Sequence, residues 1–223
     1  MSLSLEKFEQ VMKEEDVIII DTRPASLFLE GYIPNAIHFK PEIIQQAAAL
    51  GLFSFHQPLV FVGPDAAQKI ATNYFEKLGF LNIKGYLEGG FETWRDANKR
   101  YDLVIEVEAD ELAMDIQFDE YLMVVDIRSE EAYDKEHIKD SINLPIVEFA
   151  DPGSMSEFDE HFNIYIVSED GEMNTLAASI LKKQGIHNIR IVQEGWEAIK
   201  ILKDKFKIEA TKPTPSADES SIL

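Results

Sequence analysis

Two Asp-x-Arg triplets are the first residues in this sequence whose types and spacing could do chemistry. Asp21 and Arg23 follow the apolar residues 18–20, and Asp126 and Arg128 follow a second apolar run. A carboxylate and a guanidinium this close can act as a catalytic acid beside an anion clamp, or as an ion pair that fixes a loop. We favour the structural alternative, because the triplet occurs twice although the neighbouring loops differ.

A second group of candidate residues lies where two later apolar runs, 59–62 and 163–167, come to an end. Loops between a buried strand and a helix often bind anions or present a nucleophile. Ser168 with Asp170 could imitate a nucleophile–acid pair, but no base can be assigned to it. We therefore treat the two loops as candidate binding loops, with the residues Gly63, Pro64, Asp65 and Ala66 in the first and Glu169, Asp170, Gly171 and Glu172 in the second.

The chain contains no cysteine, which excludes disulfides, thiolate metal sites and cysteine catalysis. Its five histidines show no metal-ligand spacing such as His-x-His, so we interpret them as surface or hydrogen-bonded side chains. We expect no metal and no cofactor. Trp94 and Trp196 lie in amphipathic helical patterns, which favours packing in the core.

Composition indicates an acidic globular protein of 223 residues with a net charge of −20. Residues 1–100 carry 10 basic and 13 acidic groups, whereas residues 101–223 carry 11 and 28. Such a surface repels nucleic-acid phosphates and anionic lipid, so we expect neither as a partner. A basic protein partner and a merely solvating surface both stay open, and the solvating surface is the commoner case.

The apolar runs are much shorter than the roughly 20 residues of a membrane span, and the sequence has no signal-peptide pattern. We therefore expect a cytoplasmic protein.

An internal repeat organises the whole chain. Residues 19–39 align with residues 124–144 at an offset of 105, which places Asp21 on Asp126 and Arg23 on Arg128. Further along, Gly79 aligns with Gly185 at an offset of 106. The sequence therefore consists of two copies of one unit.

Within each copy, short β-branched runs alternate with helical patterns. Apolar residues from Ala67 to Leu78 fall on one face of a helix that Gly79 can end, and the second copy repeats this up to Gly185. Fully apolar strands alternating with helices predict an α/β fold with a mainly parallel central sheet and helices on both faces. We expect two domains, 1–100 and 101–205, a disordered C-terminal tail at 206–223, and strands at 17–21, 59–62, 83–87, 122–126, 163–167 and 189–193.

These repeated residues resemble a rhodanese-like domain, twice. The family signature is Asp-x-Arg at a strand end, an aromatic residue about five positions on, and a Gly-His-Ile-Pro-Gly-Ala-like turn, with a closing Gly-Gly-aromatic-x-x-Trp pattern at 89–94. Asn35 and Asp140 replace the glycine of the turn, and both residue types tolerate a positive φ.

The resemblance implies a sulfurtransferase site that has lost its nucleophile. The family works through a cysteine at the end of the central strand, inside a loop whose N–H groups stabilise a thiolate or persulfide. Counting back from Gly79 places this position at Val62, and counting back from Gly185 places it at Ser168. Neither side chain can carry a transferable sulfur, and the carboxylates of the second loop oppose an anionic substrate. Both domains are thus predicted to be inactive.

The tandem is similar to the C-terminal pair of metallo-β-lactamase-fold proteins fused to two rhodanese-like domains. Our first hypothesis is a catalytically inactive module, a pseudoenzyme that binds or positions a protein partner or a fused metallohydrolase domain in sulfur metabolism. The alternative is a sulfurtransferase whose activity depends on a missing domain or a partner's cysteine. A third hypothesis is recognition of a small anion by the loops. The oligomeric state stays open.

Overall fold

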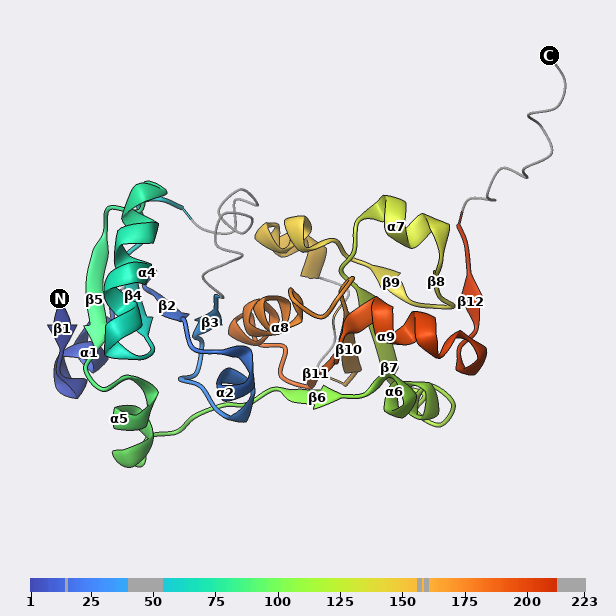
Figure 1. Ribbon diagram of the computed structural model, residues 1–223, viewed down its shortest axis with the longest axis horizontal. Coiled ribbons are helices and arrows are strands. Elements are labelled where there is room, and N and C mark those ends of the chain that lie inside the picture. The colour runs from blue at the N-terminus through green and yellow to red at the C-terminus, as the bar shows by residue number, and fades with distance from the viewer. Residues whose placement is uncertain (15, 40–53, 156–157, 159–160, 212–223) are drawn as a thin grey trace, which may run out of the picture.

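The computed structural model describes residues 1–14, 16–39, 54–155, 158 and 161–211. They form two α/β domains, which lie side by side along the long axis of the molecule (Figure 1). Domain 1 contains β1 (Ser2–Leu3), α1 (Leu5–Val11), β2 (Ile18–Asp21), α2 (Ala25–Glu30), β3 (Ile37–His38), β4 (Leu59–Val62), α4 (Asp65–Lys77), β5 (Ile83–Leu87) and α5 (Gly90–Asp96).

Domain 2 repeats this order of elements. It contains β6 (Ile105–Val107), α6 (Ala109–Asp115), β7 (Leu122–Asp126), α7 (Glu130–Lys135), β8 (His137–Ile138), β9 (Ile142–Asn143), the 3-10 helices η2 (Ile146–Ala150) and η3 (Pro152–Met155), β10 (Asn163–Val167), α8 (Asn174–Lys183), β11 (Ile189–Val192), α9 (Gly195–Ile201), η4 (Lys203–Lys205) and β12 (Ile208–Glu209).

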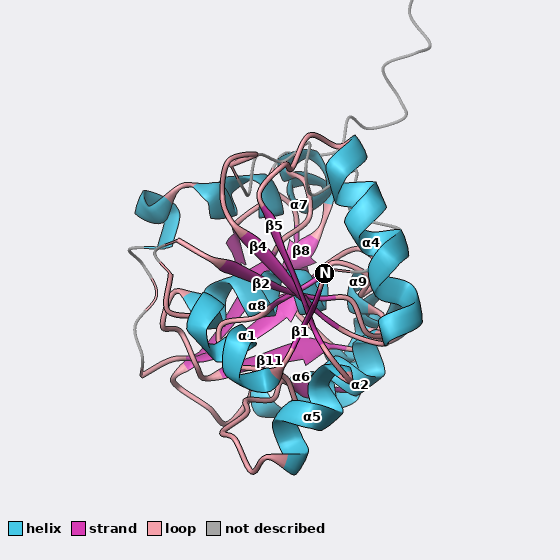
Figure 2. Cartoon of the chain, turned by 90° about the vertical axis from the view of Figure 1, so that its left-hand side faces the viewer, coloured by secondary structure: helices cyan, strands magenta, loops and turns pink. Residues whose placement is uncertain are grey.

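Each domain is built on a five-stranded parallel sheet, and the two sheets have the same topology. The strand order is β1-β5-β4-β2-β3 in domain 1 and β6-β11-β10-β7-β9 in domain 2. Helices cover both faces, as the view along domain 1 shows (Figure 2). The predicted fold class and the tandem repeat are therefore confirmed.

The strands are buried on both faces because nearly every residue in them is apolar. In domain 2, Val124, Tyr165 and Val192 pack with α6 and α9, whereas the alternate residues Val125 and Ile166 pack on the side of α8. This two-residue alternation is the pleat of a strand, and here both sides of the pleat carry apolar residues. The predicted strands agree with the observed ones to within one residue.

The edge strands β1 and β6 were not among the strands predicted from the sequence. β1 has only two residues, but Leu3 is buried and Ser2–Leu3 pairs with Tyr86 and Leu87 of β5. Gly85 is needed beside it, because a Cβ there would collide with the carbonyl oxygen of Met1. Runs this short carry too little periodicity to be recognised.

The end of each domain folds back onto its own α2 or α7 region. In domain 1, Asp102 forms an antiparallel bridge with Tyr32, and in domain 2, β12 pairs with β8 in the same way. The prediction of a tail starting at residue 206 is corrected here, because backbone pairing places Ile208 and Glu209 in the fold. Residues 212–223 of the predicted tail lie outside the described residues.

Helix α8 joins the two domains. Its residues 174–182 are all buried, because one side covers the sheet of domain 2 and another packs against β3 of domain 1 (Figure 1). His38 of β3 donates its backbone N–H to Ser179 Oγ at 3.1 Å, and its Nδ1 lies 2.8 Å from Thr175 Oγ1. Lys182 pairs with Asp102 at 3.1 Å. One continuous apolar core therefore extends through both domains.

Helix α4, the counterpart of α8 in domain 1, is less buried than α8 in the part of the chain that the structure describes. The position equivalent to Ser179 is Asn73, which is exposed, and Ile70 on the same helix is 70% exposed. The predicted apolar face of this helix is thus only partly buried. None of the helices in the described parts of the chain is long and apolar enough to cross a lipid bilayer.

We predict that Ser179→Leu destabilises the protein by about 1–3 kcal/mol, because it removes the hydrogen bond to His38 and adds volume where α8 meets β3. The matched control is Asn73→Leu at the exposed equivalent position of α4, with an expected effect within about 0.5 kcal/mol. Urea unfolding measures both. Equal effects at the two positions would show that the interface does not contribute to stability.

Candidate functional site

A buried ion pair stands at the carboxyl end of the second strand of each domain. Arg128 Nε and Nη2 donate to both oxygens of Asp126, at 2.7–3.1 Å, and Arg23 binds Asp21 with the same geometry. All four side chains are at most 5% exposed. The arginine then reaches across to a backbone oxygen, Gly31 O in domain 1 and Glu136 O in domain 2.

An aromatic ring from the last helix of each domain covers the guanidinium. Arg23 lies 4.2 Å from the ring centroid of Phe91, and Arg128 lies 3.9 Å from that of Trp196. The sequence indicated core packing for Trp196 and missed this stacking contact. The signal was available, since Phe91 and Trp196 align in the repeat just as the arginines do. Cation–π contact and the ion pair together hold the second strand, the following turn and the last helix.

The turn after each Asp-x-Arg triplet has the backbone geometry that the resemblance implies. Asn35 and Asp140 have φ values of 67° and 64°, in the left-handed region. Next to this turn in domain 2, Asn143 Nδ2 donates to the carbonyl oxygens of Asp126 and Arg128. The Tyr133 hydroxyl donates to Ser141 O at 2.5 Å, and burial raises the pKa of Tyr133 above its ordinary value.

The loop that follows β10 consists of residues 168–173 and is held by hydrogen bonds at Ser168. Ser168 is buried, and its Oγ accepts a hydrogen bond from the Gly171 N–H at 3.0 Å. The carbonyl oxygen of Ser168 accepts from Trp196 N at 2.7 Å. Gly195 must lack a side chain, because a Cβ there would collide with this carbonyl oxygen. The Ser168 hydroxyl thus receives the backbone N–H that would support a sulfur anion at this position.

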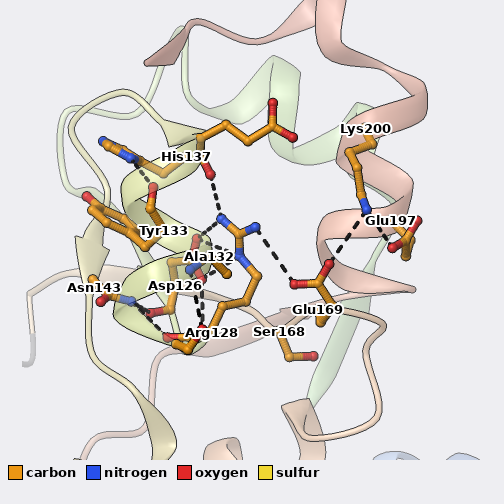
Figure 3. A network of polar contacts seen from close by, with 12 residues as sticks. Asp126, Arg128, Ala132, Tyr133, His137, Asn143, Ser168, Glu169, Glu197 and Lys200 are labelled. Carbon is orange, nitrogen blue, oxygen red and sulfur yellow. Dashed lines mark hydrogen bonds and ion pairs between the residues drawn. The ribbon is translucent and has the colours of Figure 1, made fainter. Parts of the chain in front are cut away.

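Glu169, the next residue, bridges two cations (Figure 3). Its carboxylate lies 3.9 Å from Arg128 Nη1 and 3.6 Å from Lys200 Nζ. Lys200 also binds Glu197 at 2.6 Å, and this hydrogen bond, with a smaller contribution from Glu169, raises the pKa of Lys200. Lys200 is therefore charged at neutral pH. Of the other loop acids, Asp170 Oδ1 accepts from Glu172 N at 3.0 Å.

The loop after β4 in domain 1 is built differently, and the structure corrects the residue assigned to the cysteine position. Asp21 pairs in register with Val62, and Asp126 pairs with Val167, so the residue equivalent to Ser168 is Gly63 rather than Val62. Counting back from Gly79 gave Val62 because the first copy is one residue shorter here. Val62 is a fully buried strand residue.

In domain 1 only Gly63 and Pro64 separate β4 from α4, where domain 2 has the six residues 168–173, because one residue is missing and α4 begins earlier than α8 does. The space beside Gly63 is filled: a Cβ there would lie 2.5 Å from Gln68 Nε2 and 2.6 Å from Thr22 Oγ1. Gln68 is buried and donates to Thr22 Oγ1 at 3.1 Å. The candidate residues Asp65 and Ala66 begin α4, and their side chains lie outside the described part of the structure.

Neither loop brings together a set of catalytic groups. Among the described residues, the Ser168 side chain hydrogen-bonds only with the Gly171 N–H, which leaves it without a base. Within the same residues, no three His, Asp or Glu side chains are placed to hold a metal ion.

Two parallel five-stranded sheets in tandem, each with a buried Asp–Arg pair and a strand-to-helix loop, define an α/β protein of the class that carries its site at the carboxyl ends of the strands. A family model described as the rhodanese-like domain matches residues 4–97 and 108–202. The chain belongs to the family of rhodanese-like domains, with two copies.

Two similar proteins carry names from sulfur chemistry. A putative sulfur carrier protein of Bacillus subtilis, YrkF, is 30% identical over 135 residues, which is 60% of this chain and 64% of that protein. A thiosulfate sulfurtransferase of Pseudomonas savastanoi, GlpE, is 29% identical over 87 residues, which is 39% of this chain and 79% of that protein. The chain thus spans just under two thirds of the first of these relatives.

Among solved structures, a 3-mercaptopyruvate sulfotransferase of Escherichia coli, SseA, matches 87% of this chain and 98% of its own chain, with 15% identity and a TM-score of 0.40. The thiosulfate sulfurtransferase of Pseudomonas aeruginosa matches 95% of this chain and 44% of its own, with 14% identity and a TM-score of 0.41.

We predict that Arg128→Gln costs about 3–5 kcal/mol of stability, because it leaves the Asp126 carboxylate buried without its partner. The control is Lys135→Gln, which breaks an exposed ion pair with Glu131 and should cost less than about 0.5 kcal/mol. Denaturant unfolding of both variants gives the comparison. A small effect of Arg128→Gln would mean that the pair is not a structural requirement.

We predict that cysteine fits at Ser168 and not at Gly63. Ser168→Cys replaces one small buried side chain with another and should cost less than about 1.5 kcal/mol, whereas Gly63→Cys pushes against Thr22 and Gln68 and should cost about 1–3 kcal/mol more. Each variant carries one thiol, so urea unfolding compares them directly. The corrected equivalence of Gly63 and Ser168 fails if Gly63→Cys is the better tolerated.

Proposed function

We propose that this chain is a catalytically inactive tandem rhodanese-like module that binds or positions a protein partner in sulfur metabolism. The observation that carries the proposal is the state of the two cysteine positions. Gly63 has no side chain and its space is taken by Gln68 and Thr22, while Ser168 has a hydroxyl without a base. The scaffold around both positions is retained, including the two buried Asp–Arg pairs.

The sulfur context comes from the family and from the names of the similar proteins, a putative sulfur carrier and a thiosulfate sulfurtransferase. The partner that we propose is a metallohydrolase domain of the metallo-β-lactamase fold, on the same or on another chain, because the tandem resembles the rhodanese pair of such fusion proteins. The acidic surface, with a net charge of −20, would favour a basic docking face on that partner.

The first test is a sulfurtransferase assay on the purified chain. We expect no thiocyanate from thiosulfate and cyanide above the buffer rate, because a hydroxyl or a hydrogen atom cannot carry the persulfide sulfur. An active thiosulfate sulfurtransferase, assayed in parallel at equal concentration, is the positive control. Stoichiometric turnover by the purified chain would overturn the proposal.

Whether the partner domain is fused to this chain is tested by measuring the mass of the native protein in extracts of its source cells. A mass near 25.4 kDa points to a partner on another chain. A mass near twice that value points to a fused domain.

One observation favours the alternative, a sulfurtransferase completed by a partner's cysteine. The loop of domain 2 still directs the Gly171 N–H at the position where a sulfur anion would stand. This alternative expects sulfur transfer only when the partner is added, and loss of that rate when the partner's cysteine is removed. Absence of any rate with co-purifying proteins would eliminate it.

A further inference from the structure

The two domains differ in the charged residues next to the loop that follows the central strand. In domain 2, the Glu169 carboxylate stands between Arg128 and Lys200 (Figure 3). In domain 1, the counterparts of these cations are Arg23 and Arg95, but the shortened loop has no glutamate: Pro64 follows Gly63 where Glu169 follows Ser168. Among the described side chains, no carboxylate bridges Arg23 and Arg95 as Glu169 bridges the two cations of domain 2.

A pocket of about 160 Å³ opens beside these two arginines. Its walls include Arg23 and Arg95, the rings of Phe91 and Tyr101, and the acidic residues Glu30 and Glu92. A cavity of this size has room for several ordered waters or for a small organic molecule.

Both arginines at this pocket have N–H donors that make only long contacts within the protein. Arg23 is only 4% exposed and is held rigidly by Asp21, and its Nη1 makes one long contact with Leu27 O at 3.4 Å. Arg95 is half exposed, and its contact with Asp96 is 3.8 Å long. Arg23 Nη1 and the exposed guanidinium of Arg95 can each donate to an anion, and a carboxylate suits them as Glu169 suits the cations of domain 2.

The acidic residues restrict the ligand further. Glu30 stands where domain 2 has Lys135, so the pocket of domain 1 carries an additional negative charge. Glu30 and Glu92 would repel a simple dianion such as sulfate or phosphate, and they would attract an ammonium group. A ligand that joins a carboxylate to an ammonium satisfies both parts of the pocket.

We propose that this pocket of domain 1 is a binding site for a small zwitterion of the α-amino-acid class. The carboxylate binds between Arg23 and Arg95, the ammonium group faces Glu30, and the side chain lies against Phe91 and Tyr101. The site lies next to the loop at Gly63, because its wall residue Glu92 is two residues from Gly90, which packs against the Gly63 carbonyl oxygen. It does not depend on the proposed lack of catalysis. Binding here would allow a small molecule to regulate the module that we propose to dock to a protein.

The test is a titration of the full chain followed by NMR, with three probes that separate the two charged groups. The probes are L-alanine, propionate, which lacks the ammonium, and ethylamine, which lacks the carboxylate. We expect saturable shifts of the Arg23 and Gly31 resonances with L-alanine at millimolar concentration. We also expect affinities at least about tenfold weaker for the other two probes, the effect of one lost charge-assisted hydrogen bond.

Three variants locate the site. Arg95→Gln should weaken L-alanine binding about tenfold, and Glu30→Gln should remove its advantage over propionate. Both residues are exposed, so folding is unaffected, which the thermal midpoints verify. Lys77→Gln on α4 removes an exposed charge away from the pocket and should change nothing.

The proposal is overturned by any of three results: no saturable shift with L-alanine, equal affinity for propionate in the wild-type protein, or an unchanged affinity in Arg95→Gln. Such a failure would leave the inactive tandem module untouched, because that proposal is decided by the sulfurtransferase assay.

Discussion

Each domain depends on a guanidinium that has been taken out of water at the end of its second strand. Arg128 could not be buried without Asp126, since an unpaired charge in the interior costs several kcal/mol, and the same holds for Arg23 with Asp21. Once buried, the planar group connects three segments. Its edges bind the strand and the turn, and its face lies against Trp196 or Phe91 of the last helix. This explains why the Asp-x-Arg triplet persists in both copies although their loops have diverged.

The two copies are alike in their sheets and unlike in the helices that follow the loops. α8 is buried all round because small and polar residues such as Thr175 and Ser179 allow it to approach β3 of domain 1 closely. The same positions on α4 carry Lys69 and Asn73. Helix α4 therefore lacks the threonine and serine that make this contact, and its Ile70 and Asn73 are exposed. The contact between α8 and β3 joins the apolar cores of the two domains into one.

The sequence predicted those features that rest on repeated local patterns. Apolar runs located the long strands, and the aligned triplets located both ion pairs. It did not predict the features that depend on how distant segments of the chain pack together. Val62 was taken for the cysteine position because counting along the chain cannot detect a deletion of one residue, whereas strand register can. The stacking of Trp196 on Arg128 and the contact of His38 with α8 also depend on how distant segments fold together. Edge strands of two or three residues are simply too short to show a period.

The two positions that align with the family's cysteine differ physically. In domain 2, the loop 168–173 directs the Gly171 N–H at the hydroxyl of Ser168. In domain 1, only Gly63 and Pro64 separate β4 from α4, and Gln68 and Thr22 occupy the space beside Gly63. The charged groups next to these two loops differ as well. In domain 2, Glu169 lies between Arg128 and Lys200, whereas in domain 1 Arg23 and Arg95 line a pocket. The shorter loop of domain 1 thus leaves room for an external ligand beside its cations, at the place where domain 2 has its own carboxylate.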